Sequence, residues 1–175
     1  YDFLNLTSSA RVNALGGNQV GLVDPDELGL SFYNPAALMP SMHKAITMNY
    51  IDYIGDIKIG YASYAHHIDE VGTFSAGIQY ANYGKFKEAT ADGQLTGNIF
   101  SASDYALNLI YSKNIWDRVT AGVNLKPIYS KYEIYSSLGI AGDAGISYVD
   151  SSGNFSAGIV AKNFGTQLTT YVSNG

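Results

Sequence analysis

Phe74-Ser-Ala-Gly-Ile-Gln-Tyr-Ala-Asn-Tyr-Gly84 returns later in the chain as Phe155-Ser-Ala-Gly-Ile-Val-Ala-Lys-Asn-Phe-Gly165, with seven identical positions and a Tyr-to-Phe exchange. A looser third copy, Val119-Thr-Ala-Gly-Val-Asn-Leu125, has its glycine at the equivalent place. In all three copies large or apolar side chains alternate with small or polar ones, which is the two-residue period of a β-strand. Such alternation is typical of outer-membrane β-barrels, whose apolar side chains face lipid and whose polar side chains face the lumen.

The composition agrees with a barrel. The chain has 15 Tyr, 19 Gly, no Cys and only 14% charged residues, and Tyr suits strand ends at the level of lipid headgroups. A net charge of -5 argues against nucleic acid as the partner. No run of 18 apolar residues is present, so we expect no transmembrane helix. The opening at Tyr1, without a signal sequence, indicates a mature, processed protein.

Residues 1–42 read as a helical, turn-rich hatch that precedes the strands. Ser8 or Ser9 can cap a short helix over 10–15, and Gly16-Gly17 can provide a left-handed exit. A second helix start is predicted at Asp24-Pro25-Asp26-Glu27, and a third at Asn34-Pro35. Arg11 can pair with an inward acid or a lumen carbonyl, and Asn34-Pro35 can fix the turn into the first strand. The preferred interpretation of Arg11, Gly16, Gly17, Asn34 and Pro35 is structural, as caps, turns and a plug.

Residues 43–175 read as the strands of a barrel. We predict seven, over 45–53, 56–66, 72–83, 104–113, 118–130, 140–150 and 154–164. Short turns at one rim alternate with long external stretches at the other, over 83–103, 130–139 and after Gly165, apart from a tight Ile54-Gly55 turn. Because bacterial barrels use even strand numbers, seven strands indicate half of a fourteen-strand barrel whose C-terminal half is missing. A closed eight-strand barrel is the alternative.

Several opening motifs carry a family resemblance. Tyr1-Asp-Phe-Leu-Asn-Leu-Thr-Ser-Ser-Ala-Arg-Val-Asn-Ala-Leu-Gly-Gly17, Asp24-Pro-Asp-Glu27 and Phe32-Tyr-Asn-Pro-Ala-Ala-Leu38 resemble the PorV/PorQ family of type IX secretion outer-membrane proteins, and are closer to the PorQ branch. The later strands resemble the family only in their general strand pattern, without specific motifs. Members are similar in fold to long-chain fatty-acid transporters, with a hatch inside or beneath a fourteen-strand barrel. The resemblance implies a Bacteroidetes-type outer membrane with a periplasmic N-terminus.

The function that this resemblance implies is assembly rather than chemistry. PorQ-like members anchor a cell-surface attachment complex, which includes a sortase-like protease and a β-rich surface protein that joins cargo to lipopolysaccharide. PorV-like members shuttle cargo to that complex. We expect docking at the external rim, where Phe86, Phe100, Tyr132 and Tyr135 can act as aromatic anchors. These side chains can equally just complete a tall barrel.

Other function classes remain open. A hydrophobic-solute transporter would share the hatch and barrel, since small inward residues (Gly77, Gly122, Gly145 and Gly158) make room for a plug or a ligand alike. A soluble β-sandwich would also show alternation, although the predicted strands are longer than usual.

The sequence gives little support for catalysis or for metal binding. A hydrolase needs a base, and the candidate histidines are His43 before the first strand and His66-His67 in a predicted turn. Asp24, Asp26 and Glu27 lack EF-hand spacing and are explained by capping. Consecutive side chains around His66-His67, Asp69 and Glu70 point to opposite faces, which does not suit a metal. We therefore expect no enzymatic activity, no metal and no cofactor.

Overall fold

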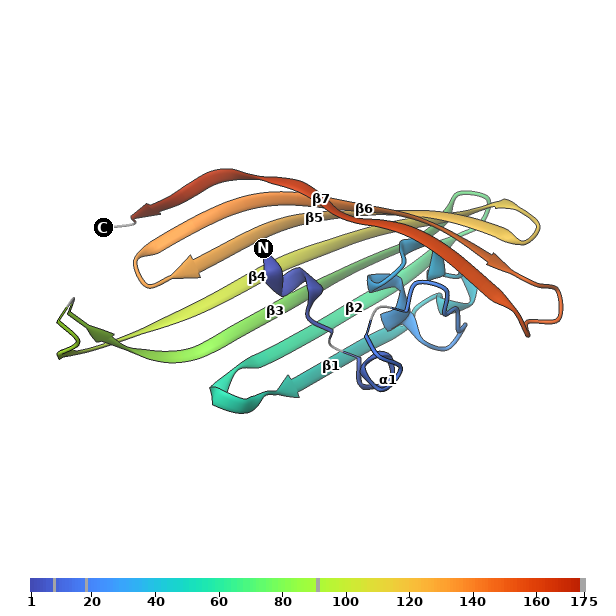
Figure 1. Ribbon diagram of the computed structural model, residues 1–175. Coiled ribbons are helices and arrows are strands. Elements are labelled where there is room, and N and C mark those ends of the chain that lie inside the picture. Colours follow the sequence, from blue (N-terminus) through green and yellow to red (C-terminus); the bar gives the residue numbers. More distant parts are fainter. Residues whose placement is uncertain (8, 18, 91, 174–175) are drawn as a thin grey trace.

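The fold is all-β and is built on one antiparallel sheet. The computed structural model describes residues 1–7, 9–17, 19–90 and 92–173. Within these ranges seven strands pair strictly in chain order (Figure 1). They are β1 (Ile46–Asp52), β2 (Lys58–Ile68), β3 (Gly72–Ala89), β4 (Leu95–Trp116), β5 (Val119–Tyr132), β6 (Tyr135–Val149) and β7 (Ser156–Ser173). The predicted number of seven strands is confirmed.

The sheet is strongly curved and open. Among the described strands, β1 and β7 each pair on one side only, so the closed eight-strand barrel is wrong for this part of the chain. The described strands also form one sheet and not the two packed sheets of a sandwich. Within the described residues, no helix has the length and apolar character needed to cross a membrane.

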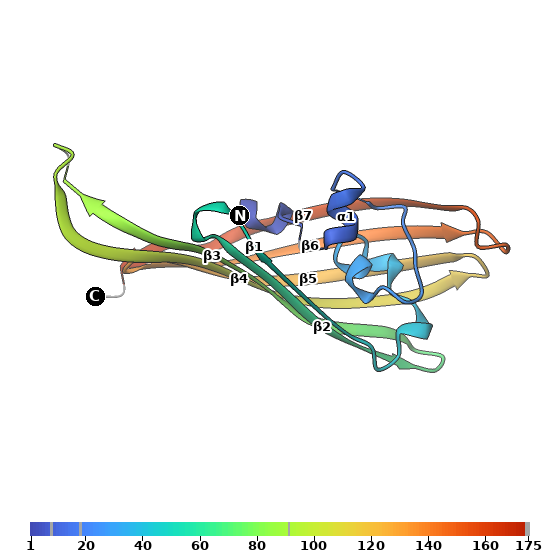
Figure 2. The same ribbon diagram turned by 90° about the horizontal axis from the view of Figure 1, so that it is seen from below.

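The N-terminal segment lies in the concave side of the sheet (Figures 1 and 2). It contains one short α-helix, α1 (Ala10–Ala14), and 3₁₀ helices over Asp2–Asn5, Leu28–Phe32, Pro35–Ala37 and Pro40–Met42, and a further 3₁₀ turn, Ile54–Asp56, joins β1 to β2. Ser9 caps α1 by accepting from the Val12 amide; the other candidate cap, Ser8, lies outside the described residues. The second predicted helix start is wrong, because Asp24 accepts from the Asp26 amide in a turn and helical structure begins only at Leu28.

Three apolar clusters attach this segment to the sheet. Phe3 and Leu4 pack on Ala81, Ala106, Ile128 and Ala141. Val12, Leu30 and Phe32 gather with Tyr61 of β2, and Leu28, Leu38 and Met42 pack on Ala65 and Ile110. A fully buried side chain of this size stabilises by roughly 1.5–3 kcal/mol. The segment and the concave face therefore share one core.

The two faces of the sheet follow the predicted alternation. On β3 the concave residues Ser75 and Gln79 are buried, whereas the convex residues Phe74 and Ile78 are 38% and 47% exposed. The same pattern runs through the burial of β4, β5 and β6. The polar face is the covered one and the apolar face is the exposed one, the reverse of a water-soluble sheet.

The predicted external loops are wrong. Most of 83–103 is a continued hairpin of β3 and β4, Tyr132 and Tyr135 flank a two-residue turn, and β7 continues to Ser173. The polar composition of these stretches resembled that of loops, but cross-strand pairs extend the strands, such as Phe86 with Phe100. Figure 2 shows the β3–β4 hairpin extending well beyond the other turns of its rim. At the other rim the short turns are confirmed, although β2 runs to Ile68 and thus includes His66 and His67.

Candidate functional site

Asn34 connects the N-terminal segment to the sheet. Its side chain is fully buried. The amide nitrogen Nδ2 donates to the Val20 carbonyl at 2.7 Å and to Ser147 Oγ of β6 at 2.8 Å, while Oδ1 accepts from the Ala36 amide at 2.9 Å. One side chain thus caps the Pro35–Ala37 turn, fixes the preceding loop and reaches the sheet.

Three glycines of the concave face provide the space for this corner. A Cβ on Gly122 would collide with the backbone of Pro35 and Ala36. A Cβ on Gly145 would meet Asn34 Oδ1, and one on Gly158 would meet the Val20 carbonyl. These three glycines, which the sequence places at the polar side of the strands, therefore accept the backbone of the plug.

The fourth inward glycine, Gly77, has a different neighbour. A Cβ there would lie 2.6 Å from Ser63 Cβ and 2.9 Å from the Ala62 carbonyl, both on β2. Gly77 therefore permits close strand contact and makes no room for the plug.

Arg11 binds acids of its own segment and not an acid of the sheet. Its Nη1 lies 2.6 Å from Asp24 Oδ2 and 2.7 Å from Glu27 Oε2. The hydrogen bond from Arg11 holds the pKa of the Asp24 carboxyl below its usual range. Arg11 thus joins α1 to the following turn, and the prediction of an inward-facing partner is wrong.

Gly16 and Gly17 end α1 in the predicted way. Their φ angles are 90° and 103°. The Gly17 amide donates to the Val12 carbonyl at 2.9 Å, which satisfies a free carbonyl at the helix end. A side chain would be strained at either position.

A buried ion pair lies behind the plug. Lys126 Nζ is 2.6 Å from Asp143 Oδ2, and both side chains are fully buried. Asn124 and the Asn163 amide donate to the same carboxylate. The ammonium groups of Lys126 and Lys162 lie 5.7 and 5.4 Å from the ring centroid of Phe32. This network joins β5, β6 and β7 to the N-terminal segment.

Two rows of aromatic rings cross the convex face. In one row, Tyr105 lies between Tyr80 at 4.9 Å and Tyr129 at 6.3 Å. The other row includes Phe74 and Tyr111, whose centroids are 5.0 Å apart. Along β4 the rows are separated by six residues, or about 20 Å at 3.3 Å per residue.

The convex positions between the rows on β3, β4 and β5 are apolar. They are Ala76, Ile78, Leu107, Leu109, Leu125 and Pro127. Charge returns just beyond the rows, with Lys113 two positions after Tyr111 and Lys131 two positions after Tyr129. We call this uncharged region, with its two rows, the apolar band.

Three of the four predicted docking residues turn toward the concave side instead of outward. Phe86, Phe100 and Tyr132 line an open pocket of about 950 Å³. Tyr135 does not line it; this side chain is 43% exposed on the other arm of the β5–β6 turn. Of the predicted aromatic anchors, three therefore line the pocket and Tyr135 lies at the rim.

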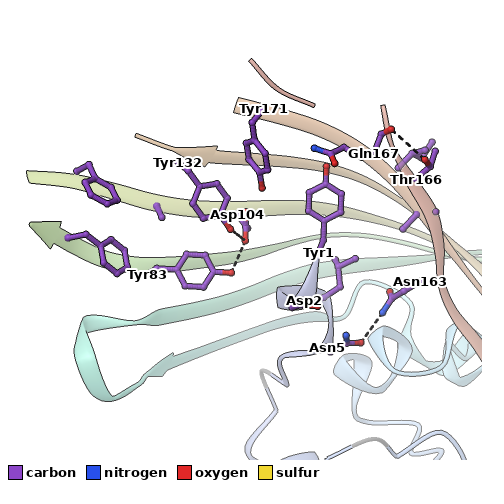
Figure 3. A pocket seen from close by; sticks show the side chains of 17 residues that line it. Tyr1, Asp2, Asn5, Tyr83, Asp104, Tyr132, Asn163, Thr166, Gln167 and Tyr171 are labelled. Carbon is purple, nitrogen blue, oxygen red and sulfur yellow. Dashed lines mark hydrogen bonds between the residues drawn. The ribbon is translucent and has the colours of Figure 1, made fainter. Parts of the chain in front are cut away.

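Sequence reasoning missed the polar centre of this pocket, Asp104. Its carboxylate is 3% exposed and accepts from Tyr83 and Tyr132 hydroxyl groups at 2.7 and 3.0 Å (Figure 3). Asp104 lies on the polar side of the β4 alternation, so the two-residue period places it on the concave face. The pairing with distant tyrosines leaves no mark in the local sequence.

Comparison with known proteins adds no family. No protein-family model matches this chain, and no curated protein matches it.

Proposed function

We propose that this protein is a non-enzymatic anchor in a bacterial outer membrane and holds the cell-surface attachment complex of a type IX secretion system. The observation that carries the membrane part of the proposal is the apolar band. Outer-membrane barrels have an apolar band between two aromatic girdles, and the two rows likewise enclose an uncharged stretch on β3, β4 and β5.

The open edges support a larger barrel. Among the described strands, β1 and β7 have one partner each, and β7 is 18 residues long. A long free edge favours pairing with further strands. We therefore propose that this sheet is about half of a fourteen-strand barrel, with residues 1–42 as its plug. The expected periplasmic position of the N-terminus does not fit this arrangement, because the Tyr1 hydroxyl group hydrogen-bonds Ser137 on the hairpin side and Tyr1 lines the same pocket as Phe86.

The anchoring part rests on the resemblance of the opening residues to the PorQ branch, together with the β3–β4 hairpin. This hairpin extends beyond the apolar band and has exposed Leu95 and Ile99, at 64% and 62%. Its proposed partners are a β-rich surface protein and a sortase-like protease, with lipopolysaccharide nearby. A cargo shuttle of the PorV kind would use the same fold.

The experiment is a detergent pull-down of the full-length protein from native outer membranes, with mass spectrometry of proteins and lipids. Recovery of the β-rich surface protein with the protease supports the anchor, whereas cargo alone indicates the shuttle. Recovery in the aqueous fraction without detergent overturns the membrane proposal.

A hairpin variant tests the contact surface. Replacing residues 86–99 by a two-residue turn should abolish partner recovery while leaving membrane insertion intact. The matched control replaces the turn 151–154 at the opposite rim and should leave recovery unchanged. Loss of recovery in both variants would argue against the hairpin.

Transport of a hydrophobic solute is the second candidate, favoured by the open pocket beside the plug. The same pull-down tests it, because a barrel carrying only an apolar ligand would support transport over anchoring. Asp104 makes a fatty acid a poor fit, since two carboxylates would then face each other.

A further inference from the structure

The pocket around Asp104 lies where the N-terminal segment leaves the concave face uncovered. Its walls come from the five strands β3 to β7 and from the first residues of the chain (Figure 3). These strands are far apart in sequence, so the pocket is a product of the fold and not of one hairpin.

Aromatic rings form much of its wall. The rings of Tyr83 and Tyr132 stack with centroids 6.2 Å apart, and Tyr171 meets Tyr132 edge-on at 5.5 Å. Phe86 and Phe100 stack at 5.4 Å on the hairpin side. Such a group of ring faces attracts cations through the negative potential above each ring.

Asp104 provides a charge without a counter-ion. Both tyrosine hydroxyl groups donate to Oδ2. The other oxygen, Oδ1, is buried and has no hydrogen-bond partner among the described residues. Leaving a buried charged acceptor without a donor is costly.

The described lining residues do not supply that counter-ion. They include two carboxylates, Asp2 and Asp104, and no Lys, Arg or His side chain. The α-ammonium group of Tyr1 also belongs to a lining residue, but among the described residues it forms no ion pair with either carboxylate. Behind the plug, the buried Lys126 pairs with Asp143, and both Lys126 and the half-buried Lys162 lie over the ring of Phe32. The pocket therefore combines negative charge, an unused acceptor and aromatic faces.

We propose that this pocket binds the primary ammonium group of a small organic amine. An N–H of the ammonium group donates to the Asp104 carboxylate, and the carbon skeleton lies against the rings of Tyr83 and Tyr132. A quaternary ammonium would lack the N–H, and a carboxylate ligand would be repelled. This inference is independent of the anchoring function, because it rests only on the pocket.

Three ligands of similar shape test the charge requirement. The full-length protein in detergent is titrated by calorimetry with cyclohexylammonium, cyclohexanol and cyclohexanecarboxylate. We expect cyclohexylammonium to bind at least about tenfold tighter than cyclohexanol, which is the size of a charge-assisted hydrogen bond, and the carboxylate not to bind. Equal affinity for the amine and the alcohol, or no binding of the amine, overturns the proposal.

Substitutions locate the site. Asp104→Asn keeps the shape and should bring the ratio of amine to alcohol affinity close to one. The matched control is Glu88→Gln, because Glu88 also accepts from neutral side chains, Thr96 and Asn98, but does not line the pocket. An unchanged ratio in Asp104→Asn overturns the assignment.

A second variant keeps the test informative if Asp104→Asn does not fold. Tyr132→Leu leaves the carboxylate and removes one ring face, and should weaken amine binding by about fivefold. Tyr132→Phe retains the ring and should recover most of that loss. Amine binding that is insensitive to Tyr132→Leu contradicts the aromatic part of the site.

Discussion

At the scale of single residues, Gly122 leaves the space on the concave face that the plug backbone at Pro35 and Ala36 occupies. In Gly122→Ala the new methyl group would collide with the backbone of Pro35 and Ala36. We expect a loss of about 1–3 kcal/mol in the free energy of unfolding, as for overpacked cores. The measurement is urea unfolding of the purified protein in detergent. The control is Gly60→Ala, where the nearest atom to a new Cβ is 3.9 Å away; an equal loss in both variants would contradict the collision.

Asp143 pairs with the buried Lys126 and also attracts the half-buried Lys162, which predicts that substitutions of Asp143 and of Lys126 differ in their cost. Asp143→Leu would leave two ammonium groups over the ring of Phe32 without their carboxylate. Removing one partner of a buried pair costs about 3–5 kcal/mol. Lys126→Met should cost less, because Asn124 and the Asn163 amide still donate to Asp143. Unfolding free energies of the two variants decide this, and a larger loss in Lys126→Met would be contrary to the prediction.

The Arg11 ion pair predicts a dependence on acid. Because Arg11 lowers the folded pKa of Asp24 below its ordinary 3.8, the pair stabilises the folded state at pH values above about 4. That contribution is lost as the pH falls through the lowered folded pKa. Arg11→Gln should therefore have a lower melting temperature than the unsubstituted protein at pH 6. At pH 2 the two melting temperatures should be equal. Lys58→Gln is the control, and a difference that persists at pH 2 would exclude the pair as its cause.

At the scale of elements, the two-residue alternation of apolar and polar side chains predicts the seven strands and their two faces. This alternation can be read from neighbouring residues alone. The strand ends do not follow from it. Residues 83–103 are polar enough for a loop, yet Phe86 and Phe100 stack across β3 and β4 at 5.4 Å. The pocket could not be predicted from the sequence, because its residues come together only across paired strands. Tyr83, Asp104 and Tyr132 meet only when three strands pair.

The extended hairpin leads to a prediction about its own stability. Phe86→Ala removes the cross-strand ring pair, worth about 0.5–1.5 kcal/mol beyond burial. We expect faster amide hydrogen exchange over 85–101, while exchange over 105–111 of β4 stays unchanged. Lys87→Ala, on the same strand, is the control. Uniform exchange changes along all of β4 would indicate global destabilisation instead.

At the scale of the whole molecule, a lipid-facing band should exclude charge. Leu107 lies inside the apolar band and Leu95 beyond it, both on β4 and both exposed, at 43% and 64%. Leu107→Arg should destabilise insertion by roughly 2–4 kcal/mol, as an arginine does near the bilayer midplane, and Leu95→Arg should have little effect. Folding from urea into lipid vesicles measures both. Equal tolerance of the two arginines would contradict a membrane at the band.

The place of Asn34 among the strands also sets the order of events during folding. Its amide meets Ser147, 113 residues later, and Tyr1 and Gly21 find partners 136 and 135 residues away, at Ser137 and Ser156. Contacts so distant in sequence form slowly, because a long loop must close first. The N-terminal segment therefore reaches its final position only after β6 and β7 have paired with the rest of the sheet.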